Sequence, residues 1–104
     1  MENKTKAQTF VGFAIRARKC KIGTNAVATL KKANLVIVCH TASENTKAEA
    51  DKLAKKFNCP IVETVSVRLE EITHKENAKV MAIADRQLSL AVLNNSENDF
   101  NVRN

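Results

Sequence analysis

Leu35-Val36-Ile37-Val38-Cys39 is an uninterrupted apolar run, and its three central residues are β-branched. A short run of this kind predicts a β-strand that is covered by other elements on both faces. Five residues are far too few to cross a bilayer, and the chain has no longer segment that would do so. We therefore expect a globular protein with this strand at the centre of its sheet and no association with a membrane.

Helical and extended patterns alternate on both sides of the central strand. Apolar residues at Ala7, Phe10, Val11 and Ala14 follow the spacing of an amphipathic helix, which predicts a helix over about residues 4–19. Phe13 and Phe57 also fit apolar stripes and are expected in the core. Further helices are predicted over residues 24–32, 44–58, 66–73 and 86–93, and further strands over residues 20–22, 61–65 and 78–84.

This alternation indicates the α/β class, and specifically a three-layer α/β/α sandwich around a small sheet. The shortness of the first strand favours a mixed sheet over a fully parallel one. With 104 residues, the chain can form one domain without disulfides or metal ions. We expect this domain to span residues 1–93. Residues 94–104 are rich in asparagine and poor in apolar groups, so they are predicted to form a disordered polar tail.

The cysteine pattern predicts neither a disulfide framework nor a metal site. Cys20, Cys39 and Cys59 are an odd number, they include no Cys-x-x-Cys pair, and no set of histidines accompanies them. Three unpaired thiols fit a reducing compartment. The apolar stretch from Thr9 to Ile15 runs directly into Arg16 without a cleavage site, which is not typical of a signal peptide. We expect a cytoplasmic monomer that uses no cofactor.

The positive charge of the chain is concentrated in its first third. Residues 1–32 contain eight lysines and arginines against one acid, a net charge of +7, whereas residues 33–104 contain nine against ten. Cations at the end of a helix also stabilise its dipole without any ligand, so part of this cluster has a structural explanation. An excess of positive charge that is confined to one segment nevertheless favours a polyanionic partner, above all a nucleic acid. The expected phosphate-binding residues are Arg18, Lys19, Lys21, Lys31 and Lys32.

Gly23-Thr24-Asn25 lies within this basic segment, where a turn is predicted to lead into a helix. Gly23 permits a tight turn and a close approach of the backbone to a ligand. Thr24 is the predicted N-cap, and the backbone N–H groups at a helix start favour phosphate. Asn25 is expected to donate to a base edge or a phosphate. Because the chain has four phenylalanines but no tryptophan or tyrosine, we expect recognition of a folded RNA shape rather than base stacking.

Signals for catalysis are weak. Cys39 and His40 are adjacent in a strand and point to opposite faces, so they cannot act together as nucleophile and base. His74 with Cys20 or Cys59 remains open. The chain's two glycines are eleven residues apart, which excludes the known phosphate-loop motifs. We expect Glu70 and its neighbour Glu71 to form a solvated helix face. His40 lies at a strand end, where α/β sheets place ligand loops, but the sequence does not decide its role.

Six segments of the chain occur in an order that resembles a known family. They are Gly12–Lys19, Gly23–Asn25, Leu35–Val38, Ala42–Lys47, Cys59–Pro60 and Val80–Asp85. Together they resemble the ribosomal protein family of the archaeal L-seven-Ae and eukaryotic L-thirty-e proteins, and most of all its small bacterial members of the YlxQ type. The resemblance covers about residues 8–93. It implies the same α/β/α sandwich, no enzymatic activity, and binding to kink-turn RNA, in which sheared G·A pairs bend a helix sharply.

The resemblance also implies which residues contact RNA. The family's Gly-x-Asn-Glu-x-x-Lys series corresponds to Gly23 and Asn25, followed by Ala26 at the glutamate position and Thr29 at the lysine position. A second contact surface of the family corresponds to the loop 74–77, which begins with His74 and Lys75. Here the family's Leu-Gly ahead of that loop is Leu69-Glu70, and its loop glycine is His74.

The expected function is therefore that of a non-catalytic, ribosome-associated RNA-binding protein. Two alternatives remain open. One is a protein-interaction module on the ribosome that binds RNA nonspecifically, which would give a steep salt dependence and little preference between RNAs. The other is a small enzyme that depends on Cys59 or His74.

Overall fold

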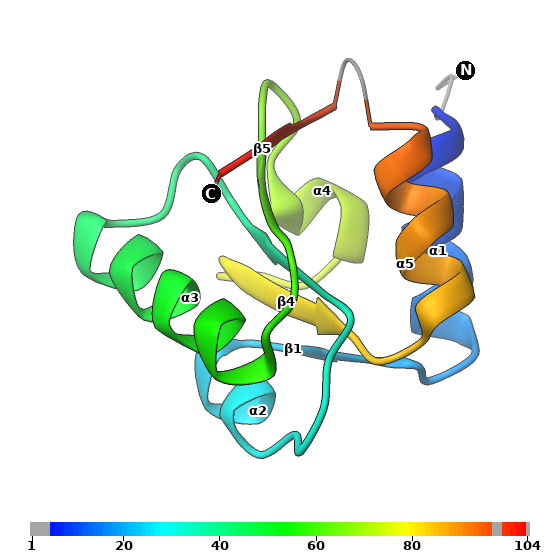
Figure 1. Cartoon of the computed structure of the whole chain (residues 1–104). Helices are drawn as coiled ribbons and strands as arrows, with labels where there is room; N and C mark the ends of the chain where they lie inside the picture. The colour runs from blue at the N-terminus through cyan, green and yellow to red at the C-terminus, as the bar shows by residue number, and fades with distance from the viewer. Residues whose placement is uncertain (1–4, 97–98, 104) are drawn as a thin grey trace.

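A five-stranded sheet lies between two layers of helices in the computed structural model, which describes residues 5–96 and 99–103 (Figure 1). The order of the strands across the sheet is β1-β4-β2-β3-β5. The strands are β1 (Cys20–Ile22), β2 (Leu35–Val38), β3 (Ile61–Thr64), β4 (Val80–Ile83) and β5 (Phe100–Val102). The helices are α1 (Lys6–Arg16), α2 (Thr24–Ala28), α3 (Glu44–Phe57), α4 (Leu69–Thr73) and α5 (Arg86–Asn94).

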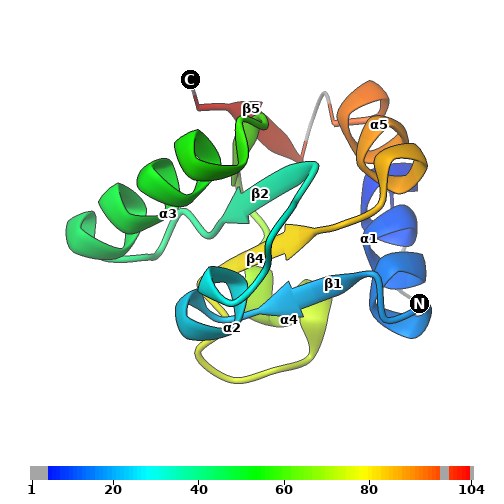
Figure 2. The ribbon, with the colours of Figure 1, turned by 60° about the horizontal axis from the view of Figure 1, so that its bottom comes forward.

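Strand β2 is the centre of the molecule, as its sequence predicts. It pairs in parallel with β3 and antiparallel with β4, so the sheet is mixed. All four of its residues are fully buried. Leu35 and Ile37 pack in the core under α1, α4 and α5, whereas Val36 and Val38 pack in the core under α2 and α3. Figure 2 shows the two helical layers on opposite sides of the strands, which confirms the predicted α/β/α sandwich.

Most helix boundaries follow from side chains that cap the first turn. The hydroxyls of Thr5 and Ser43 accept hydrogen bonds from the N–H groups of Gln8 and Thr46, at the starts of α1 and α3. The carboxylate of Asp85 does the same at the start of α5. None of the helices in the described part of the chain is both long and apolar enough to cross a membrane.

The predicted N-cap and the predicted end of the second helix are both wrong. The N-cap is Gly23, not Thr24, and no side chain caps the helix. The helix ends at Ala28, well before Lys32. At its end the hydroxyl of Thr29 donates to the carbonyl of Ala26 at 2.6 Å, a bond to the helix's own backbone of the kind that competes with helix continuation.

The predicted disorder of residues 94–104 is also wrong for the residues that the structure describes there. Asn94 ends α5, and β5 pairs antiparallel with β3 at the edge of the sheet. Phe100 is only 3% exposed. The guanidinium of Arg103 lies 2.9 Å from Asp51 and 2.7 Å from Glu63. Composition alone missed this strand because one buried phenylalanine and the two ion pairs of Arg103 hold it. Residues 97, 98 and 104 lie outside the described part.

Phe13 does not belong to the core, contrary to prediction. Its side chain is 42% exposed, because Ala7, Val11 and Ala14 form the buried stripe of α1. The ring contacts Phe10 edge-on, and the guanidinium of Arg16 lies 5.0 Å from its centre.

Candidate nucleic-acid interface

The basic residues predicted to bind phosphate lie along one edge of the sheet. Strand β1 is the edge strand, and β4 is its neighbour in the sheet. Arg18 and Lys19 connect α1 to β1, Lys21 lies within β1, and Lys31 and Lys32 follow α2. We use the term basic edge for Arg18, Lys19, Lys21, Lys31, Lys32 and Lys75.

Backbone hydrogen bonds to β4 hold these segments in place. The carbonyl of Lys19 accepts from Ala84, and the N–H of Asn34 donates to Ile83, so both connections adjoin the end of β4. At the other end of the strand, the N–H of Gly23 donates to Val80 at 2.7 Å. The turn at Gly23 therefore lies beside the chain that leaves the loop 74–77.

The loop 74–77 connects α4 to β4, the strand that pairs with β1. Burial raises the pKa of the Cys20 thiol, while the positive charges of Lys75 and Lys21 act on the same group and lower it. Lys75 therefore lies near enough to the start of β1 for its charge to act on Cys20. The structure thus brings Lys75 next to the segment around Gly23, although about fifty residues separate them in sequence.

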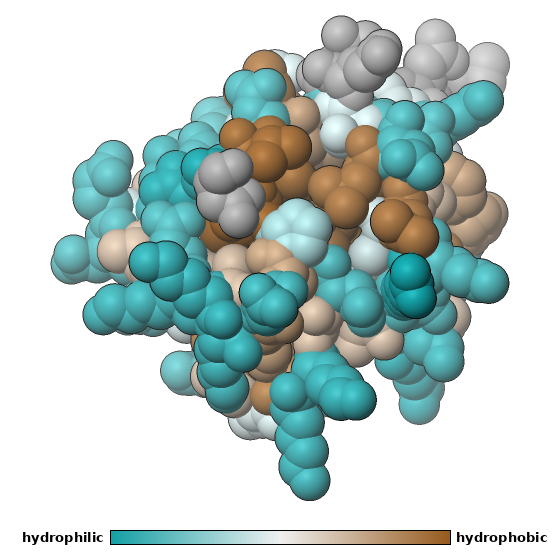
Figure 3. Space-filling view, viewed as in Figure 1, coloured by the Kyte–Doolittle hydropathy of each residue, from teal (hydrophilic) through white to brown (hydrophobic). Residues whose placement is uncertain are grey.

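The positive charge of the basic edge is not neutralised within the protein. Each of its six side chains is exposed, and none takes part in an ion pair or side-chain hydrogen bond with another described residue. The cations that do pair with acids lie elsewhere: Lys47, Arg68, Lys79 and Arg103. In Figure 3, long hydrophilic side chains project from the lower part of the molecule over α2, whereas apolar surface gathers near β5 and α5. Such an edge attracts a polyanion.

Arg18 has an unfavourable backbone conformation. After α1, its φ is 58°, in the left-handed region that glycine usually occupies at this point of a helix end. The N–H of Arg18 donates to Ile15 and that of Lys19 to Ala14, which completes the Schellman arrangement. A residue other than glycine costs about 1–2 kcal/mol there. An arginine kept at that cost is consistent with a role for its side chain.

We expect Arg18→Gly to stabilise the protein and to weaken RNA binding. Relief of the left-handed strain, partly offset by the greater freedom of glycine in the unfolded chain, should raise the free energy of unfolding by about 0.5–1 kcal/mol. Urea unfolding measures this, with Arg18→Ala as the control that removes the side chain and keeps the strain. Equal stability of the two variants would contradict the left-handed conformation.

The turn before α2 differs from expectation in one respect. Gly23 has φ 101°, so only glycine fits there without strain, as predicted. However, α2 has five residues, and a helix this short contributes little dipole to an anion site. Binding at this turn must rest on side chains. Those of Thr24 and Asn25 line a groove against α3, while the hydroxyl of Thr29 is engaged in its own helix.

The second predicted contact, His74, ends α4 in a left-handed conformation with φ 59° and is exposed.

Glu70 is not part of a solvated face, contrary to prediction. Its carboxylate pairs with Lys79 at 2.7 Å, and the hydrogen bond from Lys79 lowers the pKa of Glu70. Lys79 also donates to Thr41. These contacts attach the end of the loop to α4. His40 is held by Thr64, whose hydroxyl lies 2.8 Å from its Nδ1.

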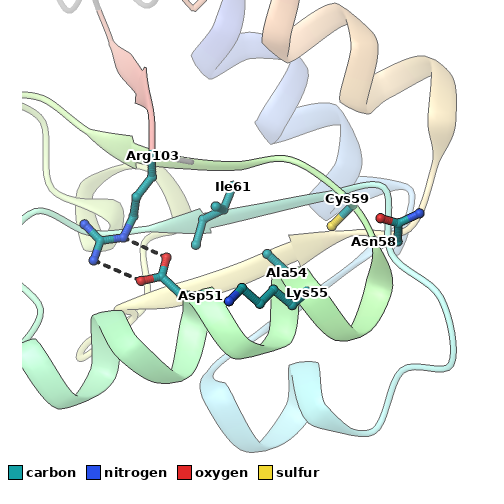
Figure 4. Close-up of a pocket in the computed structure, with 7 residues that line it drawn as sticks. All are labelled: Asp51, Ala54, Lys55, Asn58, Cys59, Ile61 and Arg103. Atoms are coloured by element: carbon teal, nitrogen blue, oxygen red, sulfur yellow. Dashed lines mark hydrogen bonds and ion pairs between the residues drawn. The ribbon is translucent and has the colours of Figure 1, made fainter.

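A cavity of about 340 Å³ lies between α3, the start of β3 and Arg103 (Figure 4). Two of its three charged groups, Asp51 and Arg103, bond to each other, and the third is Lys55. Cys59 also lines it, and burial raises the pKa of that thiol, which keeps it protonated at neutral pH. The lining contains no histidine, so His74 is not a partner for Cys59 there. In the described part of the chain, no cluster of histidine, cysteine and acidic residues could hold a metal ion.

Glu49 and Lys52 of α3 were not singled out from the sequence. They line the same groove as Asn25, although the two segments are 24 or more positions apart. Their spacing of three indicates only that both lie on one face of a helix. The approach of α2 to α3 is what makes them part of the interface.

Comparison with known proteins supports the fold. No protein-family model matches the chain, and no curated protein matches it. A protein of unknown function from Bacillus halodurans has a similar structure, with a TM-score of 0.71 and 24% sequence identity over 88% of this chain and 96% of that one. The two chains share a fold. At this level of identity, the likeness extends to the α/β architecture alone.

Proposed function

We propose that this chain is a non-catalytic RNA-binding protein of ribosomal type and a member of the L-seven-Ae and L-thirty-e family. The observation that carries the proposal is the basic edge, where six exposed cations from four separate segments surround β1 without acidic partners among the described residues. Cations spaced along an edge in this way fit the phosphates of a nucleic acid, which position a protein on its target.

Shape rather than base stacking is the proposed basis of recognition. Phe100 is buried, and the exposed ring of Phe13 is covered on one side by Arg16. The ring of Phe57 has the ammonium of Lys56 at 5.3 Å. The described surface therefore offers one exposed phenylalanine ring, covered on one side, rather than the series of rings on which successive unpaired bases stack. Basic side chains beside a tight glycine turn suit a bent, folded RNA such as a kink-turn.

The absence of catalysis is part of the proposal. It is supported by the raised pKa of Cys20 and Cys59, because a protonated thiol is a poor nucleophile. Cys39 is fully buried, with its sulfur close to Thr41 and to the N–H of Leu69. We further propose that the protein works as a monomer in the cytoplasm and associates with the ribosome.

Fluorescence anisotropy with two RNAs of equal length tests this function. One RNA contains a kink-turn and the other is a fully paired duplex, and each is titrated at several salt concentrations. We expect tighter binding to the kink-turn, with affinity that falls steeply with salt. Equal, salt-steep binding to both would favour the alternative of a ribosome-associated module that binds RNA nonspecifically. Binding to neither RNA would refute the proposal.

Two variants in the same assay separate positioning from recognition. Lys21→Ala removes a phosphate contact. It should weaken binding to both RNAs alike and reduce the slope of log affinity against log salt. Asn25→Ala should lower the preference for the kink-turn. If both variants lost affinity uniformly, Asn25 would not be a base-contacting residue.

A further inference from the structure

A groove of about 260 Å³ separates α2 from α3 next to the basic edge. Ala28 and Leu53 supply its apolar surface. The polar residues that line it are Thr24, Asn25, Glu49 and Lys52. The groove begins directly after the glycine turn, and Lys56 of α3 closes the far end of α2 by donating to the carbonyl of Ala28 at 3.1 Å.

The polar side chains of this groove are available for a ligand. None of the four makes a side-chain hydrogen bond or an ion pair with another described residue. In the larger cavity that α3 also lines, the only acid, Asp51, is bonded to Arg103. The groove therefore presents donors and acceptors above an apolar surface, which is how small planar ligands are usually bound.

We propose that the groove binds one unpaired guanine of the RNA. Glu49 is the only acid in the lining, and a carboxylate there repels phosphate and accepts hydrogen bonds from N–H and O–H donors, of which a base offers only the N–H kind. Guanine has two adjacent donors, N1–H and the N2 amino group, which can both donate to one carboxylate. Its O6 and N7 are acceptors that suit an ammonium such as that of Lys52.

The other bases fit this lining less well. Adenine and cytosine offer a single amino group, and the acceptor nitrogen beside it is repelled by a carboxylate. Uracil offers one N–H, and the carbonyls on both sides of it are also repelled. The amide of Asn25 can both donate and accept, so it serves any base and adds no preference of its own. Glu49 is thus the specificity-determining residue. The volume, below that of pockets for drug-sized ligands, suits one base rather than a longer segment of RNA.

This inference rests on the proposed RNA-binding function, and the experiment separates the two. RNA hairpins that differ only in a single-nucleotide bulge of guanine, adenine, uracil or cytosine are titrated by fluorescence anisotropy. We expect guanine to bind about tenfold more tightly than the other bases, since this is the order of discrimination that one bidentate contact supplies. Glu49→Gln, which keeps the size of the side chain, should abolish that preference.

Glu44→Gln is the matched control, because Glu44 is exposed in the first turn of the same helix and does not line the groove. It should retain the guanine preference, and both variants should melt at the wild-type temperature. If wild-type protein binds all four hairpins equally, or if Glu49→Gln keeps the preference, the guanine site is refuted while salt-dependent RNA binding stands. If no hairpin and no kink-turn RNA binds, both proposals fail.

Discussion

Replacing Arg18, Lys19 and Lys21 together by alanine is expected to lower the affinity for RNA by about 100- to 500-fold at 0.1 M salt. These three side chains lie on and beside the exposed edge strand β1 and have no acidic partners in the described part of the chain. Each lost phosphate contact removes roughly 0.7–0.9 from the slope of log affinity against log salt, so the slope should fall by about 2 to 3. Anisotropy titrations between 50 and 300 mM salt, roughly the range over which such slopes are resolved, measure both quantities.

A second triple variant controls for net charge. Lys6, Lys55 and Arg68 are exposed cations at the start of α1, on α3 and ahead of α4, and their replacement by alanine removes the same charge. We expect little change in affinity or slope. If the two triple variants lost affinity equally, RNA binding would follow total charge, and the basic edge would have no special role.

Phe100→Ala is expected to destabilise the protein by about 3–5 kcal/mol. Phe100 is 3% exposed and packs in the core that α1, α4 and α5 cover, so its truncation leaves a cavity in addition to the lost apolar burial. Val102, in the same strand, is 62% exposed, and Val102→Ala should change stability by no more than about 0.5 kcal/mol. Urea unfolding compares them. A disordered tail would make both substitutions neutral, and that outcome would remove β5 from the fold.

The sequence predicts the layers of this fold but not its edges. Leu35–Val38 is apolar throughout because both of its faces are buried, and a pattern of that kind can be recognised without knowledge of its neighbours. The position of β1 beside β4, and of β5 beside β3, depends on pairing between segments that are far apart in the chain. Local patterns contain no information about such partners.

The missed strand illustrates the same limit. Phe100 and Val102 alternate with Asn101, but three residues are too few for a period-two signal, and the surrounding asparagines favour a prediction of disorder. What orders this segment is the pocket for Phe100 and the two acids that receive Arg103. Both exist only after the rest of the domain has formed.

Part of the candidate site can likewise be predicted from the sequence, and part of it cannot. Charge counting finds five of the six cations of the basic edge, because the first third of the chain contains a single acid; Lys75 stands next to Glu76 and was expected only from the resemblance. Glu49 could not be found by counting, since it is one of three acids on a lysine-rich helix, which has the composition of any solvated face. Its proposed role depends on a groove that forms where two helices meet.

The hydrogen bond between Thr5 and Asp99 has a consequence for biosynthesis. The hydroxyl of Thr5 caps α1 and also donates to the carboxylate of Asp99, and Gln8 in the first turn reaches the same carboxylate. A nascent chain that has emerged only as far as α5 lacks both this partner and the strand that seals the core. Domains generally begin to fold from their N-terminal part during synthesis, but here the first turn of α1 gains the Asp99 carboxylate only after residue 99 has been translated. The core that α1, α4 and α5 cover is likewise completed only when Phe100 follows, so a chain stalled before residue 99 would leave the site of that ring unfilled.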